Sequence, residues 1–208
     1  MQALEDTLVM VLFSLVVGAI IGIFLGISIV VTRPGGVLEN HWIYRLLNPV
    51  INVIRSLPFI ILLVAIIPFT RFIVHTTIGT PAAIVPLIVY IAPYIGRLVE
   101  NSLLEVNDGI LEAANAMGAS PWQVIRYFLL PEALGSLILS LTTATIGLIG
   151  ATAMAGTVGG GGIGDLAISY GYERFDTFTM IATVVLLIIV VQLVQSFGNY
   201  LANKARKI

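Results

Sequence analysis

The sequence has no cysteine and few charged residues. Lysine, arginine, aspartate and glutamate make up 10% of the 208 residues, whereas about a quarter is usual in water-soluble proteins. The lack of cysteine excludes disulfides and sulfur-ligated metals. Ten basic and eleven acidic residues leave a net charge of −1, which excludes the basic surface of a nucleic-acid-binding protein. This composition is typical of a chain whose main partner is the lipid bilayer.

Sites for nucleotides and metals are also missing from the sequence. No stretch matches G-x-x-x-x-G-K-[ST], the loop that holds the phosphates of a bound nucleotide. The two histidines, His41 and His75, lie far apart, and we assign no metal site to them. We therefore expect no catalytic residue, no cofactor-binding residue and no metal ligand in this chain, which would not be an enzyme.

Most of the sequence consists of apolar segments, and 58% of the residues are hydrophobic. Several segments are long enough to cross about 30 Å of hydrocarbon as helices. The sequence predicts an all-α polytopic membrane protein with five transmembrane helices, in a single transmembrane domain over residues 1–208. The predicted spans cover residues 7–31, 46–69, 81–98, 133–155 and 177–201.

The distribution of basic residues predicts the orientation of these spans. Five spans place the termini on opposite sides, and the cytoplasmic side of a membrane protein carries the excess of lysine and arginine. An outer N-terminus and a cytoplasmic C-terminus leave only Arg71 and Arg174 outside. The inner side then holds Arg33, Arg45, Arg55, Arg97, Arg126, Lys204, Arg206 and Lys207.

Ionisable residues are not expected at the centre of any span. Arg55, Arg97 and Glu100 are predicted near cytoplasmic helix ends, where their charges would reach water. An ion-coupled carrier normally needs a buried carboxylate or histidine to carry the ion. The pattern therefore weighs against an ion-coupled carrier.

Residues 101–132 form the predicted cytoplasmic segment between the third and fourth spans. Asn107 is suited to cap a helix, and Gly118 is suited to end it. A capping box at Ser120 and Gln123 starts a second helix, which Pro131 is expected to break before the next span. The first of these short helices has a small-residue surface typical of a docking element, although a surface helix packed on its own chain would look similar.

This segment resembles the EAA loop of ABC importer permeases. Glu112-Ala113-Ala114, then Gly118, then Leu130-Pro131 follow the family pattern, except that Phe128 stands where the family favours isoleucine. In that family the helix is a coupling helix that seats on a cytoplasmic ATPase. The resemblance implies this role for Glu112, Ala113, Ala114 and Gly118. It weighs against a membrane scaffold without transport function.

The same resemblance implies the partners and the location of the chain. ATP and magnesium would be bound by a cytoplasmic ATP-binding subunit present in two copies. A second copy of this chain would complete a homodimer, and an extracytoplasmic substrate-binding protein would deliver the cargo. The expected location is the bacterial inner membrane, which the chain crosses several times.

Further segments resemble the methionine-uptake permeases within this family. The likeness lies in residues 55–63, 67–71, 82–87 and 97–101, and in the glycine-rich run of residues 159–164 with the following Tyr170-Gly171-Tyr172. The run itself departs from the family, which has an alanine and a leucine within it. The resemblance implies D- and L-methionine as cargo, with another amino acid or small metabolite as the alternative.

The fourth span carries small and hydroxyl-bearing residues at helical spacing. Such a face lines a water-filled pathway or forms a close helix–helix contact, and spacing alone favours neither. The resemblance favours the pathway, with Ser140 and Thr143 lining it and Met154 as its gate. In the first span, Gly18, Gly22 and Gly26 favour tight helix packing. The stripe on the fourth span is Ser136, Ser140, Thr143, Gly147, Gly150 and Met154.

Overall fold

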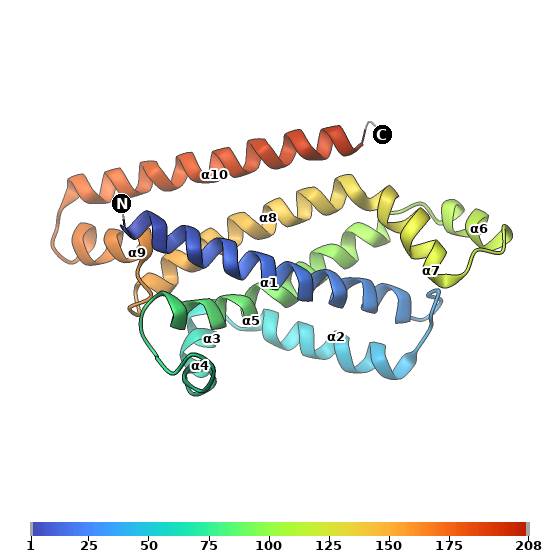
Figure 1. The fold of residues 1–208 in the computed structure, drawn as a ribbon, viewed down its shortest axis with the longest axis horizontal. Coiled ribbons are helices and arrows are strands. Elements are labelled where there is room, and N and C mark those ends of the chain that lie inside the picture. The colour runs from blue at the N-terminus through green and yellow to red at the C-terminus, as the bar shows by residue number, and fades with distance from the viewer. Residues whose placement is uncertain (1, 207–208) are drawn as a thin grey trace.

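The computed structural model describes residues 2–206, and the regular structure in this range is entirely helical (Figure 1). The molecule is elongated, with α6 and α7 at one end and α9 at the other, beside the N-terminus. We call these the α6 end and the α9 end. The helices are α1 (Gln2–Thr32), α2 (His41–Ser56), α3 (Phe59–Ala65), α4 (Ile67–Val74), α5 (Thr80–Leu104), α6 (Asp108–Ala116), α7 (Pro121–Gln123), α8 (Leu130–Gly156), α9 (Gly162–Leu166) and α10 (Thr177–Ala205), with π-helical turns at Val124–Leu129 and Ala167–Tyr172.

Four helices are long and apolar enough to cross a membrane. They are α1, α5, α10 and a continuous helix, Pro121–Gly156, that contains α7 and α8. The helices α2 and α3 together would form a fifth span, but the pair is bent by 104°. The all-helical prediction is therefore confirmed, with four spans, or five if the bent pair is one span.

The second predicted span, residues 46–69, is not one straight helix. Helix α2 begins at His41, where the side chain of Asn40 accepts hydrogen bonds from Trp42 and Ile43. It ends at Ser56, because Leu57 precedes Pro58 and adopts an extended conformation (φ −82°, ψ 129°). The ring of a proline disfavours the helical conformation of the residue before it. The chain then turns sharply into α3.

Pro131 does not end a helix, contrary to the prediction. It lies in the first turn of α8, directly after the π-helical turn Val124–Leu129. A π turn shifts the backbone hydrogen bonds from residue i−4 to i−5, and this local change of register accommodates a residue that has no N–H. The fourth predicted span therefore begins ahead of residue 133, as part of a helix that starts at Pro121.

The most extensive packing in the core joins α1 to α5. A methyl group added at Gly18 would lie 2.3 Å from Ile91 Cγ2, and one at Gly22 would lie 2.6 Å from the carbonyl oxygen of Ala92. At Gly26 it would lie 2.6 Å from the carbonyl oxygen of Gly96. The predicted tight packing of these glycines is confirmed, because only a residue without a side chain allows the two backbones to approach so closely.

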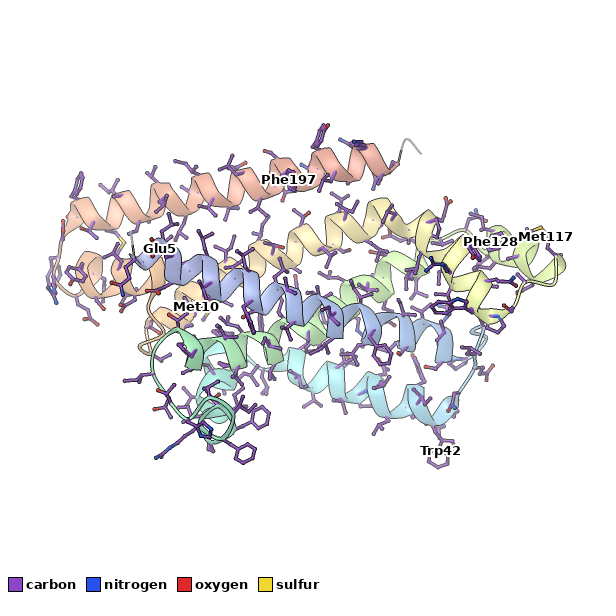
Figure 2. All side chains as sticks on the ribbon, viewed as in Figure 1. Glu5, Met10, Trp42, Met117, Phe128 and Phe197 are labelled. Carbon is purple, nitrogen blue, oxygen red and sulfur yellow. The ribbon has the colours of Figure 1, made fainter. Side chains whose placement is uncertain are left out.

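Helix α10 lies along α8 at the edge of the bundle (Figure 1). It buries few residues, among them Gly198, where an added methyl group would clash with the side chain of Thr142. Phe197, labelled on α10 in Figure 2, is exposed, as are most of its large apolar neighbours on this helix. The apolar surface of α10 is therefore left for lipid or for another chain.

Candidate functional site

The predicted short helix is present as α6, at one extreme of the molecule. The main-chain N–H of Gly109 donates a 2.8 Å hydrogen bond to Asn107 Oδ1, which caps the start of the helix. The end is closed by a 3.1 Å hydrogen bond from the N–H of Ala119 to the carbonyl of Ala114. Gly118 has φ +73°, a conformation that side chains rarely adopt. The next helix begins at Ser120, whose N–H donates to Gln123 Oε1 at 2.8 Å.

The four predicted coupling residues do not share one environment. Glu112, Ala113 and Gly118 are exposed, and a methyl group added at Gly118 would meet nothing within 4 Å. Ala114 is 0% exposed and packs against its own chain. The small size of Ala114 therefore serves the packing of α6 on the bundle, whereas the other three residues are accessible to a partner.

Two large apolar side chains that the sequence analysis did not single out flank this surface. Met117 is 68% exposed and Trp122 is 66% exposed. Met117 marks the tip of the α6 end in Figure 2. Large exposed apolar residues that lie close together are typical of contact surfaces. The sequence places both residues beside the turns at Gly118 and Ser120, but only the structure shows that they are exposed.

The stripe on the fourth span is divided between two environments. Ser136 Oγ donates a 2.7 Å hydrogen bond to Glu105 Oε2, and Ser140 Oγ lies 2.8 Å from Ser102 Oγ. Thr143, in contrast, is exposed. The first part of the stripe is thus engaged with α5.

The remainder of the stripe faces away from the chain. Methyl groups added at Gly147 and Gly150 would meet nothing within 4 Å, and Met154 is 42% exposed. The structure thus brings Thr143 and Met154 onto one open face of α8 and leaves Ser140 at the contact with α5.

Helix α2 carries a polar stripe that the sequence analysis missed. His41, Arg45, Asn48, Asn52 and Arg55 are spaced 4, 3, 4 and 3 residues apart, which places them on one face of the helix. The helix is otherwise mostly apolar. The helical period of these polar residues was visible in the sequence. It was overlooked because the second span was predicted to begin only at residue 46.

Arg97 joins this stripe to α5. Its Nη2 atom donates hydrogen bonds of 2.7 Å to Asn48 Oδ1 and 2.6 Å to Asn52 Oδ1. Its Nη1 atom pairs with Glu100 Oε2 one turn further along α5. The side chains of Arg97 and Glu100 are only 17% and 10% exposed. They do not lie at a free helix end as predicted, because α2 packs over them.

Arg55 lies in the last turn of α2 and is exposed, as predicted, but this helix end lies beside the middle of α5 rather than at an end of the bundle. It follows His41 by fourteen residues, or about 21 Å along α2. Its guanidinium carbon lies 6.0 Å from the ring centre of Tyr94, which is near the middle of α5. Within residues 2–206 no carboxylate lies within ion-pair distance of Arg55.

The basic residues outside this region gather at the α6 end. Arg71 and Arg174 lie on the segments at the α9 end. Lys207 lies outside the described residues. The α6 end carries Arg33, Arg45, Arg126, Lys204 and Arg206.

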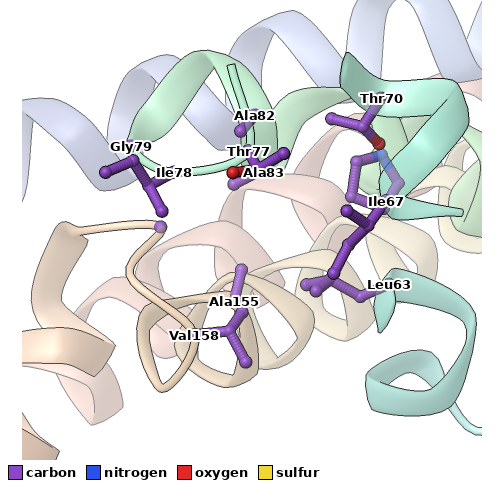
Figure 3. Close-up of a pocket in the computed structure, with 12 residues that line it drawn as sticks. Leu63, Ile67, Thr70, Thr77, Ile78, Gly79, Ala82, Ala83, Ala155 and Val158 are labelled. Atoms are coloured by element: carbon purple, nitrogen blue, oxygen red, sulfur yellow. The ribbon is translucent and has the colours of Figure 1, made fainter. Parts of the chain in front are cut away.

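An apolar pocket at the α9 end is too small for a substrate. Its walls include Leu63, Ile67, Thr70, Ala83 and Ala155 (Figure 3). Its volume is about 20 Å³, which is room for about one water molecule. Thr70 Oγ1 is buried there without a hydrogen-bond partner among the described residues, which is consistent with a single water rather than a ligand site.

Comparison with known proteins shows the family of the chain. Residues 18–207 match the family described as "Binding-protein-dependent transport system inner membrane component". The chain is 50% identical over 204 residues to the probable D-methionine transport system permease protein MetI of Vibrio cholerae, covering 98% of this chain and 91% of that protein. It is 51% identical over 151 residues to the D-methionine transport system permease protein MetI of Escherichia coli, covering 73% and 70%.

Solved structures agree with this assignment. A chain of the MetNI methionine ABC transporter in an inward-facing conformation superposes with a TM-score of 0.95 at 46% identity, covering 98% of this chain and 94% of that chain. A chain of an amino acid ABC transporter shares the fold alone, with a TM-score of 0.75 at 18% identity. The match over residues 18–207 and the 50% identity along nearly the whole chain show that this chain belongs to the family of inner membrane components of binding-protein-dependent transport systems.

Proposed function

We propose that this chain is the permease subunit of an ATP-driven importer for methionine. The observation that carries this proposal is the similarity along nearly the whole chain to proteins named as D-methionine permeases and to a chain of a methionine ABC transporter. Two copies form the translocation pathway between them. Two copies of a separate ATPase bind ATP and magnesium, and an extracytoplasmic binding protein delivers the substrate.

The α6 end is the cytoplasmic end in this proposal. The concentration of arginine and lysine there, against Arg71 and Arg174 at the opposite end, supports this orientation. The bent pair α2–α3 then counts as one broken span among five, so that the N-terminus lies outside and the C-terminus lies in the cytoplasm. A break in a span is tolerated where the freed backbone groups are surrounded by protein or water.

Helix α6 is the coupling helix. Glu112, Ala113 and Gly118 contact the ATPase, while Ala114 seats α6 against the π-helical turn that leads into α8. Because α8 continues that turn without a break, a displacement of α6 is passed along α8 as the motion of a rigid body. ATP binds better to the closed ATPase pair, and this difference in affinity drives the change between inward-facing and outward-facing states.

The open face of α8 contributes to the pathway. Thr143, Gly147 and Gly150 leave room for a substrate or for the second copy, and Met154 supplies the bulky apolar gate toward the outer side. Ser140 lies deeper, at the contact between α8 and α5. The hydroxyl groups replace part of the hydration of a polar substrate as it passes.

Uptake of labelled methionine into proteoliposomes tests this function. The vesicles hold this chain with its ATPase, the binding protein is added outside, and ATP is enclosed. ATP-dependent uptake of D- or L-methionine is expected, and vesicles without this chain are the control. Uptake of another amino acid or small metabolite in place of methionine would support the alternative cargo, and uptake without ATP would contradict the importer itself.

A further inference from the structure

Arg55 is an exposed cation about halfway along the bundle, beside Tyr94 near the middle of the membrane-spanning helix α5. Such a charge is costly in hydrocarbon and is kept almost only where it faces water, pairs with another group or serves a function. The other basic residue at similar depth, Arg97, is satisfied by Glu100, Asn48 and Asn52. Arg97 already ties α2 to α5, so this contact between the helices does not require Arg55.

No acidic residue of the described chain lies unpaired at the depth of Arg55. Among the acidic residues of the described chain, only Glu100 lies on the inner half of a span near Arg55, and it is paired with its own Arg97. Glu105 lies at the end of α5, eleven residues beyond Tyr94, which corresponds to about 16 Å. The other acidic residues lie near the two ends of the bundle. The described residues therefore leave the charge of Arg55 without a carboxylate, and a ligand can supply one.

A polar face leads from the α6 end to Arg55. His41, Arg45, Asn48 and Asn52 form a continuous row along α2, with Arg55 as its last member before the bend at Pro58. Arg45, Asn52 and Arg55 are exposed on the surface of the chain. A row of this kind allows water, and a polar solute, to reach the middle of the bundle from the α6 end.

A row of aromatic rings continues beyond Arg55. The rings of Tyr94 and Tyr90 are stacked with centres 6.3 Å apart, and Phe59 meets Tyr90 edge to face at 5.2 Å. Phe59 is 5% exposed and closes the row at the start of α3. Aromatic rings bind apolar side chains, make favourable contacts with thioether sulfur and attract ammonium groups.

We propose that Arg55 binds the carboxylate of the amino acid in transit, while Tyr94 and Tyr90 contact the rest of the molecule. A guanidinium offers a planar pair of donors that matches a carboxylate, and the pair forms two charge-assisted hydrogen bonds. The ring beside it at 6.0 Å holds the guanidinium in place without neutralising its charge. This inference rests on the proposed function, because it takes an amino acid as the cargo.

Photolabelling tests the site directly. The permease–ATPase complex in nanodiscs, without binding protein or nucleotide, is irradiated with a diazirine analogue of methionine that keeps its carboxylate. Mass spectrometry then maps the label. Label on the peptide that holds Tyr90 and Tyr94 is expected, and methionine should compete for it. Methioninol, which lacks the carboxylate, should compete at least about tenfold less well, since hydrogen bonds to a charged group are among the strong ones.

Variants separate recognition from folding. Arg55→Gln should lower the labelling by about tenfold, and Arg55→Lys, which keeps the charge but loses the planar fork, by less. Arg33→Gln, at the α6 end, is the matched control and should label as the wild type does. If Arg55→Gln fails to assemble with the ATPase, Arg55→Lys and the methioninol competition still decide the outcome.

Three results would overturn the proposal. They are label in Arg55→Gln at the wild-type level, competition by methioninol equal to that by methionine, and label confined to other segments. Vesicle uptake is measured in parallel. Methionine uptake without label near Tyr94 contradicts the role of Arg55 alone, whereas absence of methionine uptake in the complete system contradicts the proposed cargo.

Discussion

The main-chain N–H of Ile163 donates a 2.8 Å hydrogen bond to Oγ1 of Thr7, which joins α9 to the second turn of α1 across 156 positions of the chain. Thr7 is 7% exposed, so water cannot replace it as the acceptor. Thr7→Val should therefore lower the free energy of unfolding by about 1–3 kcal/mol, the cost of a buried donor without a partner. The midpoint of thermal unfolding in detergent measures the effect. Ser28→Ala, which removes only a bond to the Phe24 carbonyl in the same helix, is the control, and equal midpoints would contradict the prediction.

Gly22 is one of the three glycines at which α1 packs closely against α5. Gly22→Ala places a methyl group 2.6 Å from the carbonyl oxygen of Ala92 and 2.7 Å from Ile95, and such overpacking costs about 1–3 kcal/mol. A lower unfolding midpoint is expected in the same assay. Gly150→Ala adds the same group where nothing lies within 4 Å, so its midpoint should not fall. A fall of the same size in both variants would show that the loss is not caused by this contact.

Gly118 separates the coupling role of α6 from its folding. Gly118→Val should leave membrane insertion intact but abolish stimulation of the ATPase by substrate-loaded binding protein. The φ of +73° costs a side-chain-bearing residue roughly 1–2 kcal/mol and displaces the turn. Gly118→Asn is the matched control, because asparagine tolerates this conformation better, and it should retain most of the stimulation. Normal stimulation in Gly118→Val would contradict the coupling role.

Met154 is the proposed gate on the open face of α8. Met154→Ala shortens a half-exposed side chain and should raise ATP hydrolysis that is not accompanied by uptake. The ratio of methionine transported to ATP hydrolysed, measured in proteoliposomes, should fall. Leu193→Ala, on the outward surface of α10, should leave the ratio unchanged. A wild-type ratio in Met154→Ala would remove this residue from the gate.

Asp176 caps the start of α10 and makes that turn sensitive to acid. The side-chain hydroxyl of Thr179 donates a 2.6 Å hydrogen bond to its carboxylate, and this bond, aided by main-chain N–H groups, lowers the pKa of Asp176 below its usual value. A lowered pKa means that the stabilisation is complete above the usual pKa of the free carboxyl group. It is lost as the pH falls through the lower pKa of the folded state.

The main-chain N–H groups of Phe178 and Thr179 donate hydrogen bonds to the carboxylate of Asp176. Hydrogen exchange at these two amides measures the acid sensitivity. Protection of these two amides, corrected for intrinsic exchange, should decrease at the acid end of the titration. In Asp176→Asn the acceptor remains but cannot titrate, so protection should not change with pH. An identical pH dependence in both proteins would exclude Asp176 as the cause.

Several features of this protein follow from the sequence by itself. The ends of α6 were predictable because Asn107 and Gly118 satisfy helix ends through neighbours within a few residues. The four long apolar helices were predictable because hydrocarbon of a given thickness requires a given length of apolar helix. The tight packing at Gly22 also follows from local spacing, although the partner helix does not.

Only the tertiary structure decided how the functional residues are arranged. Arg55 was expected at a helix end, and it lies in the last turn of α2, but only the packing of α2 on α5 places its guanidinium beside Tyr94 near the middle of α5. Ala114 was expected on the docking surface, but the seat of α6 on the chain buries it. These positions depend on which helices become neighbours, and contacts between residues far apart in the chain leave no periodic signal in either segment alone.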